Sequence, residues 1–213
     1  MRHFRAIPLF LLFAASFAIA DSIPNPHTLS IITGIPHPLT LAYDYRVGNF
    51  FSIGAATGYF TYTYRLSSGD DVDLSSENYD IRARIHPFSG SFFFGVIAGT
   101  RTYKATSTRD IPLASGLTIP VTGTLSISSY YLTPHIGWLW TNGGGFSLGI
   151  ELGCQIPLSP STELNIPVVE AFAPEVKQTS EYKRLESDIN GPALQIGKTP
   201  LPYLALLRLG WTF

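Results

Sequence analysis

The end of the chain, Leu201–Phe213, reads LPYLALLRLGWTF and alternates between two unlike sets of residues. Counting back from the end, every second position is apolar or aromatic: Phe213, Trp211, Leu209, Leu207, Ala205 and Tyr203. The positions between them hold Thr212, Gly210, Arg208, Leu206 and Leu204. A period of two residues indicates a β-strand with two different faces. We expect one face to suit hydrocarbon and the other to carry the arginine, the glycine and the threonine.

The same alternation recurs along the chain between short clusters of turn residues. In 39–47 every second residue is Leu, Tyr or Val, and the residues between include Asp44 and Arg46. Gly48-Asn49 then gives a two-residue hairpin signal. The pattern predicts eight strands, at about 28–34, 39–47, 50–65, 77–87, 91–106, 126–141, 145–158 and 201–213.

Short and long links alternate between these strands. The links at 48–49, 88–90 and 142–144 are tight turns, and those at 66–76, 107–125 and 159–200 are long. An even number of strands joined in this way is typical of transmembrane β-barrels, which have short periplasmic turns and long outer loops. Both chain ends then fall on the periplasmic side.

Aromatic residues gather at both ends of the predicted strands, as in the two girdles of a membrane barrel. Beside the short turns or the chain end lie Phe50, Phe51, Phe92, Trp140, Phe146, Trp211 and Phe213. Towards the long loops lie Tyr59, Tyr62, Tyr64, Tyr79, Tyr103, Tyr130 and Tyr203. A lipocalin-like soluble barrel is the alternative, but its second face would be solvated and would not carry so many Gly and so few Lys.

Composition narrows the possible functions. Charged residues make up 14% of the chain, against about 25% in an ordinary soluble domain. The net charge of -1 argues against a nucleic-acid partner, which usually requires a basic excess. The single cysteine, Cys154, excludes an intramolecular disulfide and a cysteine-rich metal site. We expect it on the lipid face.

Residues 1–20 have the pattern of a signal peptide. Arg2, His3 and Arg5 form a basic start, 6–17 is apolar, and Ala18-Ile19-Ala20 is a cleavage site. Cleavage after Ala20 would leave a barrel domain at 21–213. The alternative is an uncleaved anchor helix.

A helical insert is expected at about 168–197, before the last strand. Apolar residues in 174–190 recur at steps of three and four, which indicates a helix. Pro174 suits its start, and Gly191-Pro192 would end it. It could be a cap, an interfacial helix or a plug at the outer end.

The inward faces of the predicted strands carry a set of charged residues. They are Asp44, Arg46, Asp80, Arg82, Arg84, His86, Arg101, Glu151 and Arg208. An eight-stranded barrel has an interior just wide enough for side chains, so charges there must pair. We expect a salt-bridge network that fills the lumen; the alternative is a narrow or gated pore with an anion bias.

No catalytic, cofactor-binding or metal-ligating residue is assigned. His86 and His135 would need a nucleophile within hydrogen-bond reach, and the sequence places no serine beside them on the same face. Asp70, Asp71 and Asp73 lack the spacing of a calcium loop, so a solvated surface loop is expected.

Four features of the sequence carry a family resemblance: the leader, the paired alternating strands, Tyr45-Arg46 before the Gly-Asn turn, and the final Leu209-Gly210-Trp211-Thr212-Phe213. With these features the chain resembles the small eight-stranded outer-membrane β-barrel superfamily, which includes OmpA-like and OmpW-like proteins. The resemblance implies an all-β, eight-stranded antiparallel up-and-down transmembrane barrel in the bacterial outer membrane. It also implies that Leu209, Trp211 and Phe213 serve as an assembly signal. The implied partners are outer-membrane lipid and the barrel assembly machinery.

Three functions are open to such a barrel. The first is a structural or surface-interaction role, with an extracellular ligand that the sequence does not identify. The second is a porin-like narrow channel for small solutes or hydrophobic molecules. The third is an envelope lipid-modifying enzyme; we expect the chain not to be an enzyme.

Overall fold

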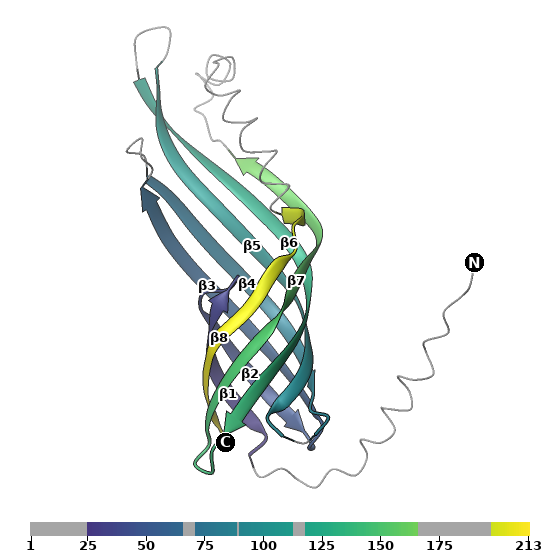
Figure 1. Cartoon of the computed structure of the whole chain (residues 1–213). Coiled ribbons are helices and arrows are strands. Elements are labelled where there is room, and N and C mark those ends of the chain that lie inside the picture. The colour runs from purple at the N-terminus through teal and green to yellow at the C-terminus, as the bar shows by residue number, and fades with distance from the viewer. Residues whose placement is uncertain (1–24, 66–70, 89, 113–117, 166–196) are drawn as a thin grey trace, which may run out of the picture.

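The fold is a closed ring of eight antiparallel strands in sequence order (Figure 1). A computed structural model of the chain describes residues 25–65, 71–88, 90–112, 118–165 and 197–213. The strands are β1 (His27–Ile35), β2 (Thr40–Val47), β3 (Phe51–Arg65), β4 (Asp71–Ile85), β5 (Phe92–Pro112), β6 (Thr118–Thr141), β7 (Phe146–Asn165) and β8 (Leu201–Thr212). The predicted all-β, eight-stranded, up-and-down fold is confirmed. The leader at 1–20 and the predicted helix at 174–190 lie outside the described residues.

The two faces of each strand have the chemistry that the alternation predicts. On β2, Leu41 and Tyr43 are exposed on the outside of the ring, whereas Ala42 and Asp44 between them are buried inside it. On β4, Ile81 points outward while Arg82 and Arg84 are buried. The barrel therefore has an apolar exterior and a polar, charged interior, the reverse of a soluble barrel.

Several strands run past the closed part of the ring (Figure 1). The prediction that 66–76 and 159–200 are loops is wrong for 71–76 and 159–165, which extend β4 and β7. These segments are polar, so they carry no apolar alternation, and cross-strand pairing orders them instead: Thr63 donates to Asp73 at 2.6 Å. β5 and β6 also lengthen into the predicted 107–125 link. The β3–β4 register has no shift near Phe60, so the loss of alternation there marks the exit from the ring and not a bulge.

β8 contains a bulge that the sequence pattern hides. Its pairing with β1 passes from Leu207 directly to Ala205, and its pairing with β7 shifts at the same place. Leu206 and Leu207 are both exposed as a result, and the strand changes face between them. The prediction that Tyr203 and Ala205 share the lipid face with Leu207 and Leu209 is therefore wrong. Both are buried inside the ring, because one extra residue reverses the alternation beyond it.

The short turns and the end of the chain lie at one end of the barrel (Figure 1). β8 closes the ring against β1, where Phe213 N donates to His27 O at 2.8 Å and His27 N donates to Phe213 O at 3.1 Å. The described part of the chain contains no helix that is long and apolar enough to cross a membrane.

Candidate functional site in the lumen

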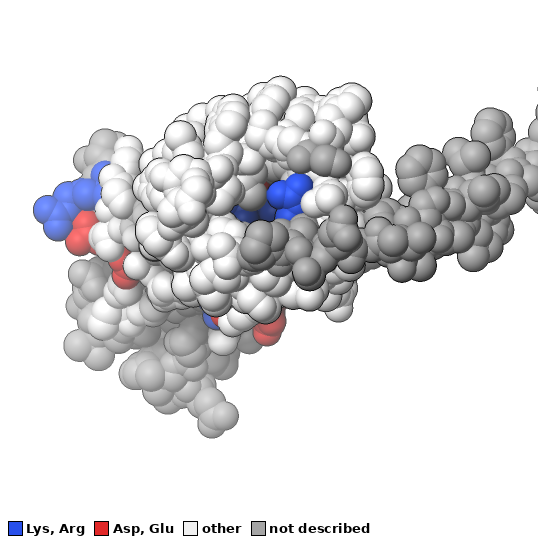
Figure 2. Space-filling model, turned by 90° about the horizontal axis from the view of Figure 1, so that it is seen from below, with Lys and Arg blue, Asp and Glu red and all other residues white. Residues whose placement is uncertain are grey.

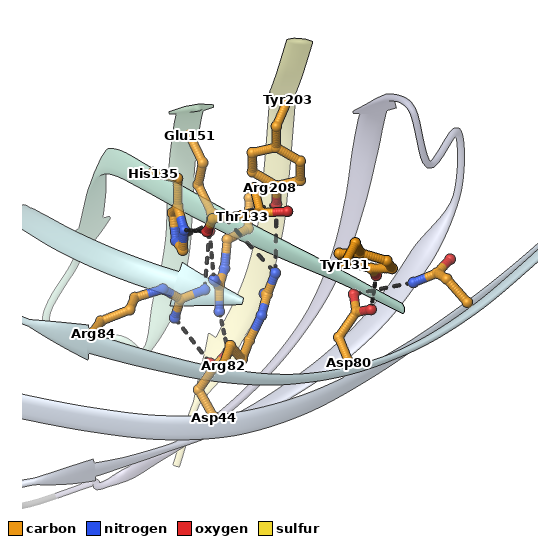
Figure 3. A network of polar contacts seen from close by, with 11 residues as sticks. Asp44, Asp80, Arg82, Arg84, Tyr131, Thr133, His135, Glu151, Tyr203 and Arg208 are labelled. Carbon is orange, nitrogen blue, oxygen red and sulfur yellow. Dashed lines mark hydrogen bonds and ion pairs between the residues drawn. The ribbon is translucent and has the colours of Figure 1, made fainter. Parts of the chain in front are cut away.

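Two arginines and two carboxylates from four strands form a closed set of ion pairs in the lumen (Figure 3). We call Asp44, Arg84, Glu151 and Arg208 the lumen quartet. Arg84 donates to Asp44 Oδ1 at 2.9 Å and to Glu151 Oε1 at 3.0 Å. Arg208 donates to the same Glu151 oxygen at 2.9 Å and to Asp44 Oδ2. Each arginine therefore bridges both carboxylates.

The lumen quartet is electrically neutral and almost completely shielded from solvent. Its side chains are between 0% and 7% exposed. Taking an ion out of water costs several kcal/mol unless a well-placed partner compensates for it. The alternation of charges gives each ion two opposite neighbours, so the sequence can place four charges inside the barrel without leaving one unpaired.

Glu151 is the centre of a wider set of contacts. Tyr203 donates to its Oε2 at 2.9 Å, and His135 Nε2 lies 3.6 Å from the same oxygen. Arg82 Nη2 lies 3.8 Å from Oε2 and donates to the Tyr203 hydroxyl at 3.5 Å. Figure 3 shows these side chains converging from β4, β6, β7 and β8. One carboxylate thus organises the middle of the lumen.

Asp80 lies in a separate polar cluster. Its carboxylate accepts hydrogen bonds from the Tyr131 hydroxyl and from Asn78 Nδ2, the latter at 3.0 Å. Figure 3 shows this group apart from the lumen quartet. Asp80 therefore has neutral hydrogen-bond donors where the quartet carboxylates have arginines.

Arg101 also has neutral partners. Its Nε donates to Ser129 Oγ at 3.0 Å and its Nη1 donates to Gln155 Oε1. Gln155 Nε2 in turn lies 2.8 Å from His37 Nε2. The guanidinium also stacks 5.2 Å from the centre of the Tyr103 ring, which is a favourable cation–π contact.

Arg46 and His86 lie at the end of the lumen beside the short turns. Arg46 is only half-buried, and its Nη2 donates to Asn49 O at 3.2 Å. His86 is buried, with Nε2 3.4 Å from Ser52 Oγ on the neighbouring strand. Ser52 therefore reaches His86 across the sheet, a contact that the spacing along one strand, on which the prediction rested, does not reveal.

The structure places every predicted lumen residue inside the ring but does not join them into one network. Asp44, Arg82, Arg84, Glu151 and Arg208 come together, whereas Asp80, Arg101, Arg46 and His86 have separate partners. The sequence pattern does not identify His37, Asn78, Tyr131, Gln155 and Tyr203 as lumen residues. Tyr131 and Gln155 have the inward parity of their strands, the bulge hides Tyr203, and His37 lies between the first two predicted strands.

No metal centre is found in the described part of the chain, where no group of His, Cys, Asp and Glu is placed to hold an ion. Cys154 is exposed on the outer face of β7. Leu209, Trp211 and Phe213 also face outward. Their role as an assembly signal stays a prediction.

Comparison with known proteins finds similarity in structure alone. No protein-family model matches the sequence, and no curated protein is significantly similar to it. The crystal structure of Acinetobacter baumannii CarO2 aligns with a TM-score of 0.48 and 11% identity, over 90% of this chain and 99% of that one. The crystal structure of Acinetobacter baumannii CarO aligns with a TM-score of 0.46 and 13% identity, over 89% of this chain and 97% of that one.

Proposed function

We propose that the chain is an integral outer-membrane β-barrel protein with a lumen closed by its own side chains, and that it has a structural or surface-interaction role. An apolar belt supports the membrane location. The outward side chains that form it include Leu29, Ile31, Leu41, Ile53, Ile81, Val96, Leu132, Ile136, Leu148, Leu152, Ile156 and Leu209. In water this surface would be exposed hydrocarbon over the whole circumference, which a monomeric soluble protein does not tolerate.

Aromatic residues at both edges of the belt support the same proposal. At the short-turn end the exposed aromatic residues are Phe50, Trp140, Phe146, Trp211 and Phe213, and at the other edge they are Tyr59, Tyr79 and Tyr130. Tyr203 does not belong to the second girdle, because it is buried in the lumen. Aromatic rings at both edges fit the two water–lipid interfaces.

The observation that carries the closed-lumen proposal is the lumen quartet. Its ion pairs join β2, β4, β7 and β8, so they cross the interior from one wall to another. An eight-stranded barrel leaves an interior just wide enough for side chains. A solute would have to break several buried ion pairs to pass.

The surface-interaction role is supported by the strand extensions. β3 and β4 pair as far as Arg65 and Asp71, and β5 and β6 pair as far as Pro112 and Thr118. These ribbons extend well beyond the closed ring (Figure 1). With the short turns on the periplasmic side, they would project from the outer surface of the cell as the parts most accessible to a partner.

Conductance in planar bilayers tests the closed lumen against the porin-like alternative. We expect no channel events from the refolded protein at any voltage. A double variant, Arg84→Ala with Glu151→Ala, removes two crossing side chains and should conduct if it folds, which a heat-dependent shift in gel mobility checks. Steady channel events from the unmodified protein would overturn the closed-lumen proposal and favour a narrow channel.

The proposal assigns no enzymatic activity to the barrel. Ser52 and His86 are in contact, but among the described residues no carboxylate orients the histidine as a third catalytic group would. Deletion of the gene should leave the envelope lipid profile unchanged. A lipid species that accumulates on deletion and disappears on complementation with the wild type, but not with Ser52→Ala, would support the enzyme alternative.

A further inference from the structure

We propose that the short-turn end of the lumen is a binding site for a tetrahedral oxyanion of the phosphate class, held by Arg46. A cavity of about 200 Å³ opens at this end, and Thr28, Arg46, Ser52, Arg84 and His86 are among the residues that line it. We call it the mouth cavity. Figure 2, seen from this end, shows a hollow with Lys or Arg atoms inside it.

The charge in the mouth cavity is unbalanced. Asp44 is the one carboxylate among the described residues that line it. Both of its oxygens already accept from arginines of the lumen quartet, Oδ1 from Arg84 and Oδ2 from Arg208. Since the quartet is neutral by itself, Arg46 adds a positive charge that Asp44 does not compensate.

Arg46 itself has spare hydrogen-bonding capacity. Among the described residues its side chain forms one hydrogen bond, to the carbonyl oxygen of Asn49, and no ion pair. Its Nε is buried without a partner. The side chain lines the cavity and keeps donors beyond the one that Asn49 uses, so an anion in the cavity can accept hydrogen bonds from it.

Other donors line the same space. Ser52 Oγ and the His86 ring, with Nε2 3.4 Å from Oγ, line the cavity. Thr28 also lines it and brings a hydroxyl from β1. These groups come from β1, β2, β3 and the end of β4, which are consecutive strands of the ring, so they line one side of the cavity. A group of guanidinium, hydroxyl and imidazole donors suits an oxyanion with several acceptor oxygens.

The size of the cavity limits the ligand. A cavity of about 200 Å³ has room for one small oxyanion with a few waters. A guanidinium binds phosphate oxygens in bidentate fashion, which gives Arg46 a specific role. The phosphate could be a free ion or the headgroup of a phospholipid at the periplasmic interface, which presents the same chemistry.

The test is a titration of the refolded, isotopically labelled protein in detergent with inorganic phosphate, at constant ionic strength maintained with chloride. We expect saturable amide shifts at Arg46, Ser52 and His86. Arg46→Gln should weaken binding at least tenfold, whereas Arg65→Gln, at an exposed position far along β3, should leave it unchanged. Equal affinity in Arg46→Gln, or the absence of saturable shifts in the wild type, would overturn the proposal.

Gel mobility and dispersed amide spectra check that Arg46→Gln still folds. If Arg46→Gln fails to fold, Arg46→Lys keeps the charge and loses the bidentate geometry; binding weakened about tenfold would support the proposal, and unchanged binding would overturn it. A second arm in phospholipid nanodiscs identifies the source. Shifts already present without added phosphate, and lost in Arg46→Gln, indicate a lipid headgroup; shifts that require added phosphate indicate the free ion.

Discussion

Arg84 and Glu151 meet at 3.0 Å inside the lumen although their strands, β4 and β7, are not neighbours in the ring. The contact ties two walls of the barrel together through its interior, in addition to the hydrogen bonds around its circumference. Glu151 accepts from Arg208 and Tyr203 as well, so it is the residue whose loss should disturb the lumen most.

Glu151→Gln should destabilise the barrel by about 3–5 kcal/mol, because it leaves buried arginines without a compensating charge. Reversible urea unfolding in lipid vesicles measures this difference. Glu163→Gln is the matched control, since Glu163 lies on the exposed extension of the same strand and should change stability by less than about 0.5 kcal/mol. Similar unfolding midpoints for the two variants would contradict the central role of Glu151.

Gly95→Ala should destabilise the barrel because a Cβ at this position would overlap the His135 ring. Adding His135→Ala removes the obstacle, so the double variant should be more stable than the sum of the two single effects predicts. A double-mutant cycle of unfolding free energies measures the coupling. Simple additivity would show that the ring moves aside freely.

Ile81→Arg should impair insertion, since Ile81 is 65% exposed on the outer face in the middle of the closed part of β4. An arginine facing lipid at mid-depth costs about 2–4 kcal/mol. Tyr64→Arg, on the extension beyond the ring, should have little effect. Folding yields into vesicles compare the two, and equal yields would argue against a membrane belt at this height.

Arg65 and Asp71 form an exposed ion pair near the end of the β3–β4 ribbon, with Nε to Oδ1 at 2.7 Å. The hydrogen bond from Arg65 lowers the pKa of Asp71 below its ordinary value of 3.8. A carboxyl group with a lowered pKa contributes stability at higher pH, and that contribution is lost as the pH falls below about 4. The amide shift of Arg65 should therefore change in this acidic range and stay constant in Asp71→Asn.

The alternation of apolar and polar residues was sufficient to predict the number of strands, their order and the inward placement of the charged residues. The alternation is a direct consequence of strand geometry, in which Asp44 and Arg46 must share a face. The polar extensions at 71–76 and 159–165 escaped prediction because a strand with water on both faces has no such signal.

The partners within the lumen could not be predicted in the same way. A period of two shows that Arg84 and Glu151 face inward, but their contact depends on the stagger and closure of the whole ring. Tyr203 was misplaced for a different reason: the additional residue at Leu206–Leu207 reverses its face, and two adjacent leucines give no sign of it.

Because β8 is the last strand of the chain, formation of the lumen quartet has a kinetic consequence. Arg208 reaches Asp44 across 164 residues of sequence, and β8 meets β1 across 184. Until the last strand arrives, Asp44 and Glu151 lack one of their two counter-ions, and the ring has an open seam. Contacts this distant in sequence form slowly, so a barrel without its final strand is incomplete in charge as well as in hydrogen bonding. Closure of the seam and completion of the lumen quartet therefore occur together.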